Sequence, residues 1–178
     1  MAKRYYAAYG SNLNIQQMKW RCPDAKIVGT AIIDGYELLY KGSKTGSYLT
    51  IEPSVKSHVP VAIWEVSEKD ELALDSYEGY PRFYYKKEMI LPVKDWNTGK
   101  TRKRKIFVYI MDENRPLGVP SRLYVDTCLE GYGDFGFDPK YLQEALERSN
   151  RNENRKHEKA LPGLRQRVRR ISGPFQKR

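Results

Sequence analysis

The sequence contains very few of the residues that cross-link small proteins or bind metal ions. Its 178 residues include only 2 cysteines, Cys22 and Cys128, and 2 histidines, His58 and His157. The cysteines lie far apart without a Cys-x-x-Cys spacing, and neither histidine has metal-binding neighbours in the sequence. We therefore expect neither a disulfide framework nor a zinc site, and no bound metal.

Long hydrophobic runs are also missing. No apolar stretch approaches the roughly 20 residues that a membrane-spanning helix needs. The first residues, Met1-Ala2-Lys3-Arg4, lead into an alternating apolar run without the hydrophobic core of a signal peptide. With 40% hydrophobic and 30% charged residues and a mean hydropathy of -0.73, the chain is predicted to be cytoplasmic, with no membrane partner.

Positive charge is concentrated at the C-terminal end of the chain. Residues 151–178 contain ten Lys or Arg and two Glu, a net charge of +8 out of +10 for the whole chain. We therefore predict one domain over residues 1–150 and a basic C-terminal tail over 151–178. Leu164, Val168 and Ile171 recur at helical spacing in this tail. It is either a solvated segment, a short basic helix that docks on the domain, or a binding site for nucleic acid or an acidic partner.

Apolar runs alternate with turn signals in a pattern typical of strands. Strands are expected at 27–33, 36–40, 48–51, 59–66, 83–91 and 105–111, with turns or loops at 34–35, 42–46, 53–60 and 95–99. Helices are expected over 14–20, 67–78, 121–129 and 139–148, the last with Asp138 as its N-cap. Mixed strands around a few helices indicate an α+β fold built on a barrel.

The segment Tyr9-Gly10-Ser11-Asn12-Leu13 is predicted to be a strand-to-helix turn. Such a turn directs free backbone N–H groups toward one point. Gly10 lets the backbone come close to a ligand, and Ser11 and Asn12 add short polar side chains beside it. A small carboxylate would fit there, although a simple turn with a helix N-cap would use the same residues. No Walker lysine follows Gly10, which argues against a nucleotide-binding loop.

Glu78 is predicted to stand in the last turn of a helix. Ser67 and Asp70 form a capping box at the start of that helix, and Gly79 is its C-terminal stop. A carboxylate at the negative end of the helix dipole has a raised pKa. A general base that works near neutral pH needs such a pKa. The alternative is an ordinary solvent-exposed glutamate at a helix end.

These segments together resemble the gamma-glutamylcyclotransferase-like family over residues 4–147. The resemblance rests on the order and spacing of 9–13, 74–79, 81–84 and 120–124, followed by Gly131 and Gly136. It implies a small mixed β-barrel with a few surrounding helices and no metal or organic cofactor. It also implies that Gly10 to Leu13 hold a gamma-glutamyl group, and that Glu78 is the catalytic acid/base.

Two tyrosines near these motifs have both a functional and a structural interpretation. Tyr84 occupies the place of a family tyrosine that would bind substrate or orient Glu78, yet it also begins a predicted strand. Tyr9 either lines the pocket or packs at the end of the first strand. Many relatives have arginine two residues after that family tyrosine, whereas this chain has Lys86.

The reaction implied by the resemblance is an intramolecular aminolysis. The α-amine of a small gamma-glutamyl substrate attacks its own γ-carbonyl, forms 5-oxoproline and expels an amine or amino acid, so the enzyme is both a transferase and a lyase in character. The leaving group is not decided by the sequence: an amino acid, an amine, a peptide and a lysine side chain all remain open. Two other hypotheses are a non-catalytic module that binds a small carboxylate and a nucleic-acid binder that acts through the basic tail.

Overall fold

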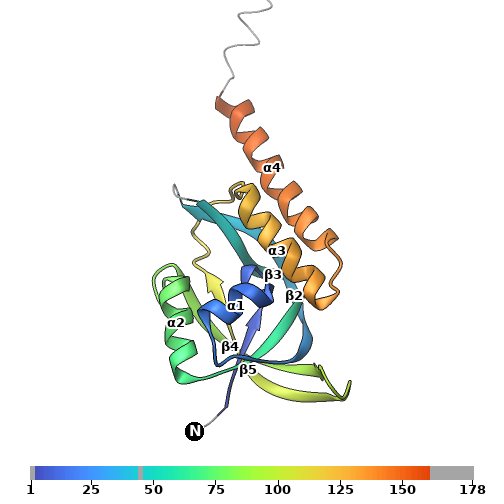
Figure 1. Ribbon diagram of the computed structural model, residues 1–178. Coiled ribbons are helices and arrows are strands. Elements are labelled where there is room, and N and C mark those ends of the chain that lie inside the picture. Colours follow the sequence, from blue (N-terminus) through green and yellow to red (C-terminus); the bar gives the residue numbers. More distant parts are fainter. Residues whose placement is uncertain (1–2, 44–45, 161–178) are drawn as a thin grey trace, which may run out of the picture.

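The computed structural model describes residues 3–43 and 46–160, and its centre is a closed barrel of five strands (Figure 1). The strands are β1 (Arg4–Ala8), β2 (Lys26–Ser43), β3 (Gly46–Val66), β4 (Tyr84–Asp95) and β5 (Thr101–Met111). They follow one another around the barrel in the order β1-β3-β2-β4-β5, and β1 closes it by pairing in parallel with β5. The predicted α+β class with a mixed β-barrel is confirmed.

Strands β2 and β3 correct the sequence prediction, which divided each of them in two. The Asp34-Gly35 turn is a bulge inside β2, because Gly35 has φ 74° and the pairing shifts between Asp34 and Tyr36. On the partner strand, residues 54–57 lie opposite this bulge, between the paired residues Pro53 and His58. The predicted 53–60 loop therefore lies within a continuous strand, β3. The hairpin predicted at 95–99 is confirmed, with Asp95 accepting hydrogen bonds from the N–H groups of Asn97 and Thr98.

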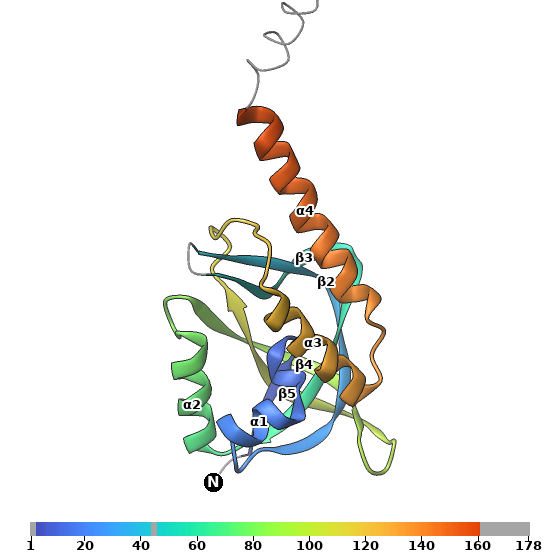
Figure 2. The ribbon, with the colours of Figure 1, turned by 45° about the horizontal axis from the view of Figure 1, so that its top comes forward.

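In the described part of the chain, four helices and one short 3₁₀ turn surround the barrel. They are η1 (Ser11–Leu13), α1 (Ile15–Arg21), α2 (Glu68–Glu78), α3 (Arg122–Phe135) and α4 (Lys140–Ala160). Figure 2 shows α1 and α3 in front of the barrel, α2 at its side, and the end of α4 extending away from it. The first half of α4 packs on β2, where the Arg148 guanidinium donates to the Leu38 carbonyl oxygen at 2.9 Å.

Helices α3 and α4 are longer than the sequence predicted. The predicted helix 121–129 continues to Phe135, because Tyr132 and Phe135 extend its buried face before Gly136 ends it with φ 66°. Gly131 is needed for close packing, since a Cβ there would lie 2.5 Å from the backbone nitrogen of Asn14. Helix α4 runs past residue 150 to Ala160. The predicted helix around Leu164, Val168 and Ile171 lies outside the described residues, and the division into domain and tail stays a prediction.

The barrel interior and the faces of the helices share one hydrophobic core. Residues Ile106 to Met111 of β5 are all buried, as are Val59 and Val61 to Trp64 of β3. Cys22 and Cys128 are free thiols within this core. Over residues 3–43 and 46–160, no helix has the length and apolar character needed to cross a membrane. The predicted cytoplasmic location is not tested by this finding.

Candidate active site

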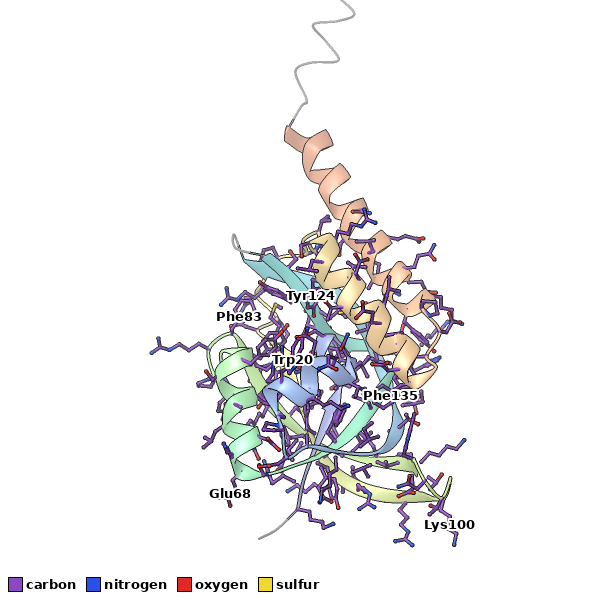
Figure 3. The ribbon with its side chains drawn as sticks, viewed as in Figure 1. Trp20, Glu68, Phe83, Lys100, Tyr124 and Phe135 are labelled. Atoms are coloured by element: carbon purple, nitrogen blue, oxygen red, sulfur yellow. The ribbon has the colours of Figure 1, made fainter. Side chains whose placement is uncertain are left out.

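A cavity of about 320 Å³ opens where the turn after β1, the end of α2 and the start of α3 meet. Figure 3 shows Phe83 beside the upper end of α2 and Tyr124 toward α3. Eight aromatic residues form much of its wall: Tyr6, Tyr9, Tyr48, Tyr77, Phe83, Tyr84, Tyr109 and Tyr124. The remaining lining residues are Gly10, Ser11, Asn12, Leu49, Ser76, Glu78 and Gly79. The cavity is therefore mostly aromatic, with Glu78 as its one carboxylate among the described lining residues.

Helix α2 places Glu78 at the cavity. The Ser67 hydroxyl accepts from the backbone N–H of Asp70, whose carboxylate accepts from that of Ser67, so the predicted capping box is present. Leu74 is fully buried and fixes the helix against the core. Gly79 ends the helix in the left-handed region at φ 65°. Glu78 is consequently the last helical residue, as predicted.

The Glu78 carboxylate is hydrogen-bonded to the turn after β1. The Asn12 side-chain amide donates to Glu78 Oε1 at 3.0 Å and to the Tyr6 hydroxyl at 3.0 Å. Its carbonyl oxygen, Oδ1, accepts from the Arg21 guanidinium. Because both ends of this buried amide are used, its orientation is fixed with the N–H groups toward Glu78. Asn12 thus joins the predicted turn directly to the predicted acid/base.

Burial is the main cause of the unusual titration of Glu78. It raises the pKa of this carboxyl from 4.5 to about 7, while the Arg21 charge and the Asn12 hydrogen bond act in the opposite direction. The helix dipole predicts the same upward direction for this pKa, but desolvation in the aromatic cavity is its largest cause. With a pKa near 7, the group is present in both protonation states at neutral pH.

Arg21 holds this arrangement from the last turn of α1. Its guanidinium lies over the Tyr77 ring, 3.4 Å from the ring centroid, and also donates to the Gln17 side-chain oxygen. The Tyr77 hydroxyl in turn lies 3.2 Å from the Ser11 hydroxyl oxygen. These contacts connect α1, η1 and the end of α2, so the turn and the carboxylate keep a fixed relation.

The turn itself leaves two backbone donors without a partner. In η1 the N–H groups of Leu13 and Asn14 bond to the carbonyl oxygens of Gly10 and Ser11. The N–H groups of Ser11 and Asn12 have no acceptor within the described residues, as expected for the first residues of a helical turn. Two donors are therefore available next to the cavity.

Gly10 provides room for Tyr124 of α3. A Cβ at position 10 would lie 3.2 Å from the Tyr124 hydroxyl oxygen. This hydroxyl accepts a hydrogen bond from the Leu49 N–H at 3.1 Å, which ties α3 to β3 at the cavity wall. The close approach at Gly10, predicted to serve a ligand, thus also serves the packing of another element of the protein.

The other predicted site residues divide between the cavity and the core. Tyr9 lines the cavity with its ring, while its hydroxyl donates to the Tyr109 carbonyl oxygen at 2.6 Å. Tyr84 also lines the cavity, and its hydroxyl donates to the Leu49 carbonyl oxygen at 2.7 Å. Leu13 is fully buried and does not line the cavity, because it packs against Gly131 of α3. Their proposed roles in substrate binding stay predictions.

Several residues of the cavity wall and of its supporting contacts were not singled out from the sequence. Tyr6 lies in the buried half of β1 and Tyr109 in the buried run of β5, where aromatic side chains are usually core residues. Arg21 carried no sequence signal, because a basic residue in the last turn of a helix is common. Tyr124 belonged to the segments that carry the family resemblance, and this was the one available signal.

Lys86 lies in an ion-pair network outside the cavity lining. Its ammonium group is 2.7 Å from Glu71 Oε1 and 2.7 Å from Asp75 Oδ1, and Arg4 also binds Glu71. Its pKa is raised, since the two carboxylates outweigh partial burial. The lysine at this position therefore stabilises the contact between β4 and α2. Among the described residues, no three His, Cys, Asp or Glu side chains gather as a metal site.

Residues 6–126 match the model of the family described as gamma-glutamyl cyclotransferase, AIG2-like. This match covers more than half of the chain, so the chain belongs to that family. Comparison with curated protein sequences gives no match. Family membership and the fold support an enzyme of the cyclotransferase type.

Solved structures show the same architecture. A gamma-glutamyl cyclotransferase aligns with a TM-score of 0.69 and 25% identity, covering 82% of this chain and 87% of that chain. An uncharacterized protein from Homo sapiens aligns with a TM-score of 0.69 and 26% identity, covering 83% and 88%. A yeast gamma-glutamyl cyclotransferase specific to glutathione has a TM-score of 0.56 at 11% identity, covering 85% and 97%. This last likeness concerns the fold alone.

Proposed function

We propose that the protein is a gamma-glutamyl cyclotransferase that releases 5-oxoproline from a small gamma-glutamyl amide. The substrate's α-amine nitrogen forms a bond to its γ-carbonyl carbon, and the bond from that carbon to the leaving nitrogen breaks. One proton passes from the attacking nitrogen to the leaving nitrogen, so the reaction needs no oxidant, reductant or water. The support is the family match together with a cavity whose volume suits a small ligand.

Glu78 would carry that proton. A base with a pKa of about 7 accepts the proton that the neutral α-amine loses on attack and returns it to the leaving nitrogen without a large energetic cost in either step. A carboxylate with an ordinary pKa of 4.5 would be a poor acid for the second step. The observation that carries this proposal is the partly buried Glu78 carboxylate hydrogen-bonded to the Asn12 amide at the cavity.

The turn after β1 would hold the gamma-glutamyl group. The N–H groups of Ser11 and Asn12 have no acceptor in the described part of the chain and are suited to a carboxylate or to the oxyanion of the tetrahedral intermediate. The aromatic walls would keep the flexible substrate folded with its amine near its γ-carbonyl. Such near-attack positioning is worth several kcal/mol in a cyclisation.

The test is release of 5-oxoproline from a panel of gamma-glutamyl amino acids, gamma-glutamyl amines and gamma-glutamyl-lysine. Wild type is compared with Glu78→Gln, which is nearly isosteric, and with Glu68→Gln at the opposite end of α2 (Figure 3). We expect turnover in wild type and Glu68→Gln and none in Glu78→Gln. Near-normal turnover by a folded Glu78→Gln variant would contradict the catalytic role.

The same panel separates the alternative functions. A module that only binds a small carboxylate would bind 5-oxoproline but release none from any substrate in the panel. Glu78 argues against this alternative, since a carboxylate in the cavity repels an anionic ligand. Binding of nucleic acid or an acidic partner through the basic tail stays a prediction, because residues 161–178 lie outside the described residues.

A further inference from the structure

Three cations lie over aromatic rings of the cavity wall, and their partners differ. Lys86 lies 5.7 Å from the Tyr109 ring centroid and is paired with two carboxylates. Arg21 lies over Tyr77 and donates to side-chain oxygens. Arg115 lies 4.5 Å from the Phe83 ring centroid, and among the described residues its guanidinium has no carboxylate and no hydrogen-bond acceptor. Arg115 is therefore the cation of the three that is free to bind an anion.

Arg115 lies in the loop between β5 and α3, and backbone hydrogen bonds attach this loop to the barrel before and after Arg115. The Asp112 N–H donates to the Phe83 carbonyl oxygen at 3.2 Å, and the Gly118 N–H donates to the Tyr40 carbonyl oxygen at 3.1 Å. Between them, the Pro116 carbonyl oxygen accepts from the Gly42 N–H at 3.1 Å. The guanidinium is thus attached to a segment held by several backbone bonds. A pre-organised arginine loses less freedom on binding than one on a free loop.

Phe83 connects Arg115 to the cavity. Its ring lines the cavity and contacts the Tyr48 ring edge to face, with 6.3 Å between centroids. Figure 3 shows Phe83 beyond the C-terminal end of α2, on the side where the loop from β5 to α3 passes. Because Arg115 is half-buried on this ring and is not itself part of the lining, it lies at the rim of the cavity.

We propose that Arg115 binds a carboxylate on the leaving group, so that the preferred substrates are gamma-glutamyl amino acids or peptides rather than gamma-glutamyl amines. This inference rests on the proposed function, in which the turn after β1 holds the gamma-glutamyl half; the leaving group would then extend toward Phe83 and Arg115 at the rim. A guanidinium has a planar pair of donors that matches a carboxylate, and the ring beneath it keeps that plane oriented. Arg115 also offsets the repulsion that Glu78 exerts on a second carboxylate.

The test compares two substrates that differ only in this carboxylate: gamma-glutamyl-alanine and gamma-glutamyl-ethylamine. The quantity measured is the ratio of their kcat/KM values in wild type, Arg115→Gln, Arg115→Lys and Arg102→Gln. Arg102 is exposed at the far end of the β4–β5 hairpin, so its replacement controls for the loss of one positive charge.

We expect wild type to prefer gamma-glutamyl-alanine and Arg115→Gln to lower the ratio roughly 10- to 100-fold, as for a lost charge-assisted hydrogen bond. Arg115→Lys should keep part of the preference, and Arg102→Gln should keep all of it. A wild-type preference for gamma-glutamyl-ethylamine would overturn the inference. An equal loss on both substrates in Arg115→Gln would also overturn it, since that result indicates a structural role.

The outcome that refutes the proposed function differs from the outcomes that overturn the role of Arg115. In that case neither substrate releases 5-oxoproline with folded wild-type protein, and no ratio exists. If Arg115→Gln does not fold, the wild-type ratio and the intermediate ratio expected of Arg115→Lys still decide the matter. A wild-type ratio near one would then contradict the role of Arg115.

Discussion

The two ends of α2 place carboxylates of the same chemical type in opposite environments. Glu71, near the N-terminal end, accepts hydrogen bonds from Arg4 at 2.9 and 3.0 Å and from Lys86 at 2.7 Å. These partners lower the pKa of its carboxyl, led by the Arg4 hydrogen bond. Glu78, at the C-terminal end, is hydrogen-bonded to the neutral Asn12 amide, and burial raises its pKa to about 7. Burial beside a neutral amide, as against hydrogen bonds from two cations, decides which of the two carboxylates remains able to exchange a proton at neutral pH.

This difference suggests why Asn12 suits its position. A lysine or arginine donating to Glu78 would lower the pKa as Arg4 does for Glu71, and the carboxylate would then hold a proton too weakly to return it. An amide orients the carboxylate without adding a formal charge. The Arg21 guanidinium bonds to the Asn12 carbonyl oxygen. Its charge lowers the pKa of Glu78 but does not reverse the effect of burial.

The raised pKa of Glu78 is expected to have its largest effect on the pH dependence of turnover. If ionised Glu78 is the base, kcat/KM falls about tenfold per pH unit well below the pKa, or roughly 50-fold from pH 7 to pH 5. Arg21→Gln removes a charge that lowers the pKa of Glu78, so the acidic limb moves to higher pH. Steady-state rates between pH 4.5 and pH 9 measure this limb. A profile unchanged in Arg21→Gln would mean that another group sets it.

The next largest effect is on the pH dependence of folding stability, and its sign follows from the raised pKa of Glu78. The folded state binds the Glu78 proton more tightly than the unfolded state, so wild-type stability falls as pH rises from 4.5 to about 7. Glu78→Gln removes this penalty and is expected to gain up to about 3 kcal/mol above pH 7 and little below pH 4.5. Urea unfolding at pH 4.5 and pH 8 measures the difference. The same change at both pH values would show that ionisation is not its cause.

Glu71→Gln should behave in the opposite way. The pKa of Glu71 is lowered, so its ionised form stabilises the folded state above its unfolded pKa of 4.5, and this contribution is lost as pH falls through the lower folded pKa. We expect a loss of roughly 1–2 kcal/mol at pH 7, since Glu71 is partly exposed and its ion pairs are screened. The loss should shrink on acidification and in high salt. A loss that stays constant from pH 7 to pH 3 would contradict the ion-pair explanation.

Helix α2 also shows how much the sequence alone could predict. Ser67 and Asp70, three positions apart, form a capping box, and Gly79 stops the helix. The helix and the position of Glu78 in its last turn therefore followed from local signals. The β4–β5 hairpin was equally local, since Asp95 bonds to residues two and three positions later. Both predictions are confirmed because their determinants lie within one turn of chain.

The partners of Glu78 were beyond local reasoning. Asn12 is 66 residues away in sequence, and its contact depends on how β1 meets the end of α2. The same limit applies to Tyr124, whose contact with Gly10 requires α3 to pack across the turn. Gly35 was misread for a related reason. A glycine at positive φ serves equally in a turn and in a bulge, and only the long pairing of β2 with β3 decides between them.

The smallest effect expected here concerns the residue that ends α2. Gly79 has φ 65°, where an L-residue is strained, and a Cβ there would lie 3.1 Å from the Phe83 Cβ. Gly79→Ala should therefore cost about 1 kcal/mol of stability. Because Gly79 and Phe83 both line the cavity, the substitution should also raise KM for a gamma-glutamyl amino acid more than it lowers kcat. Thermal unfolding and steady-state kinetics measure the two effects. A stable variant with unchanged KM would show that the end of α2 can move without disturbing the cavity.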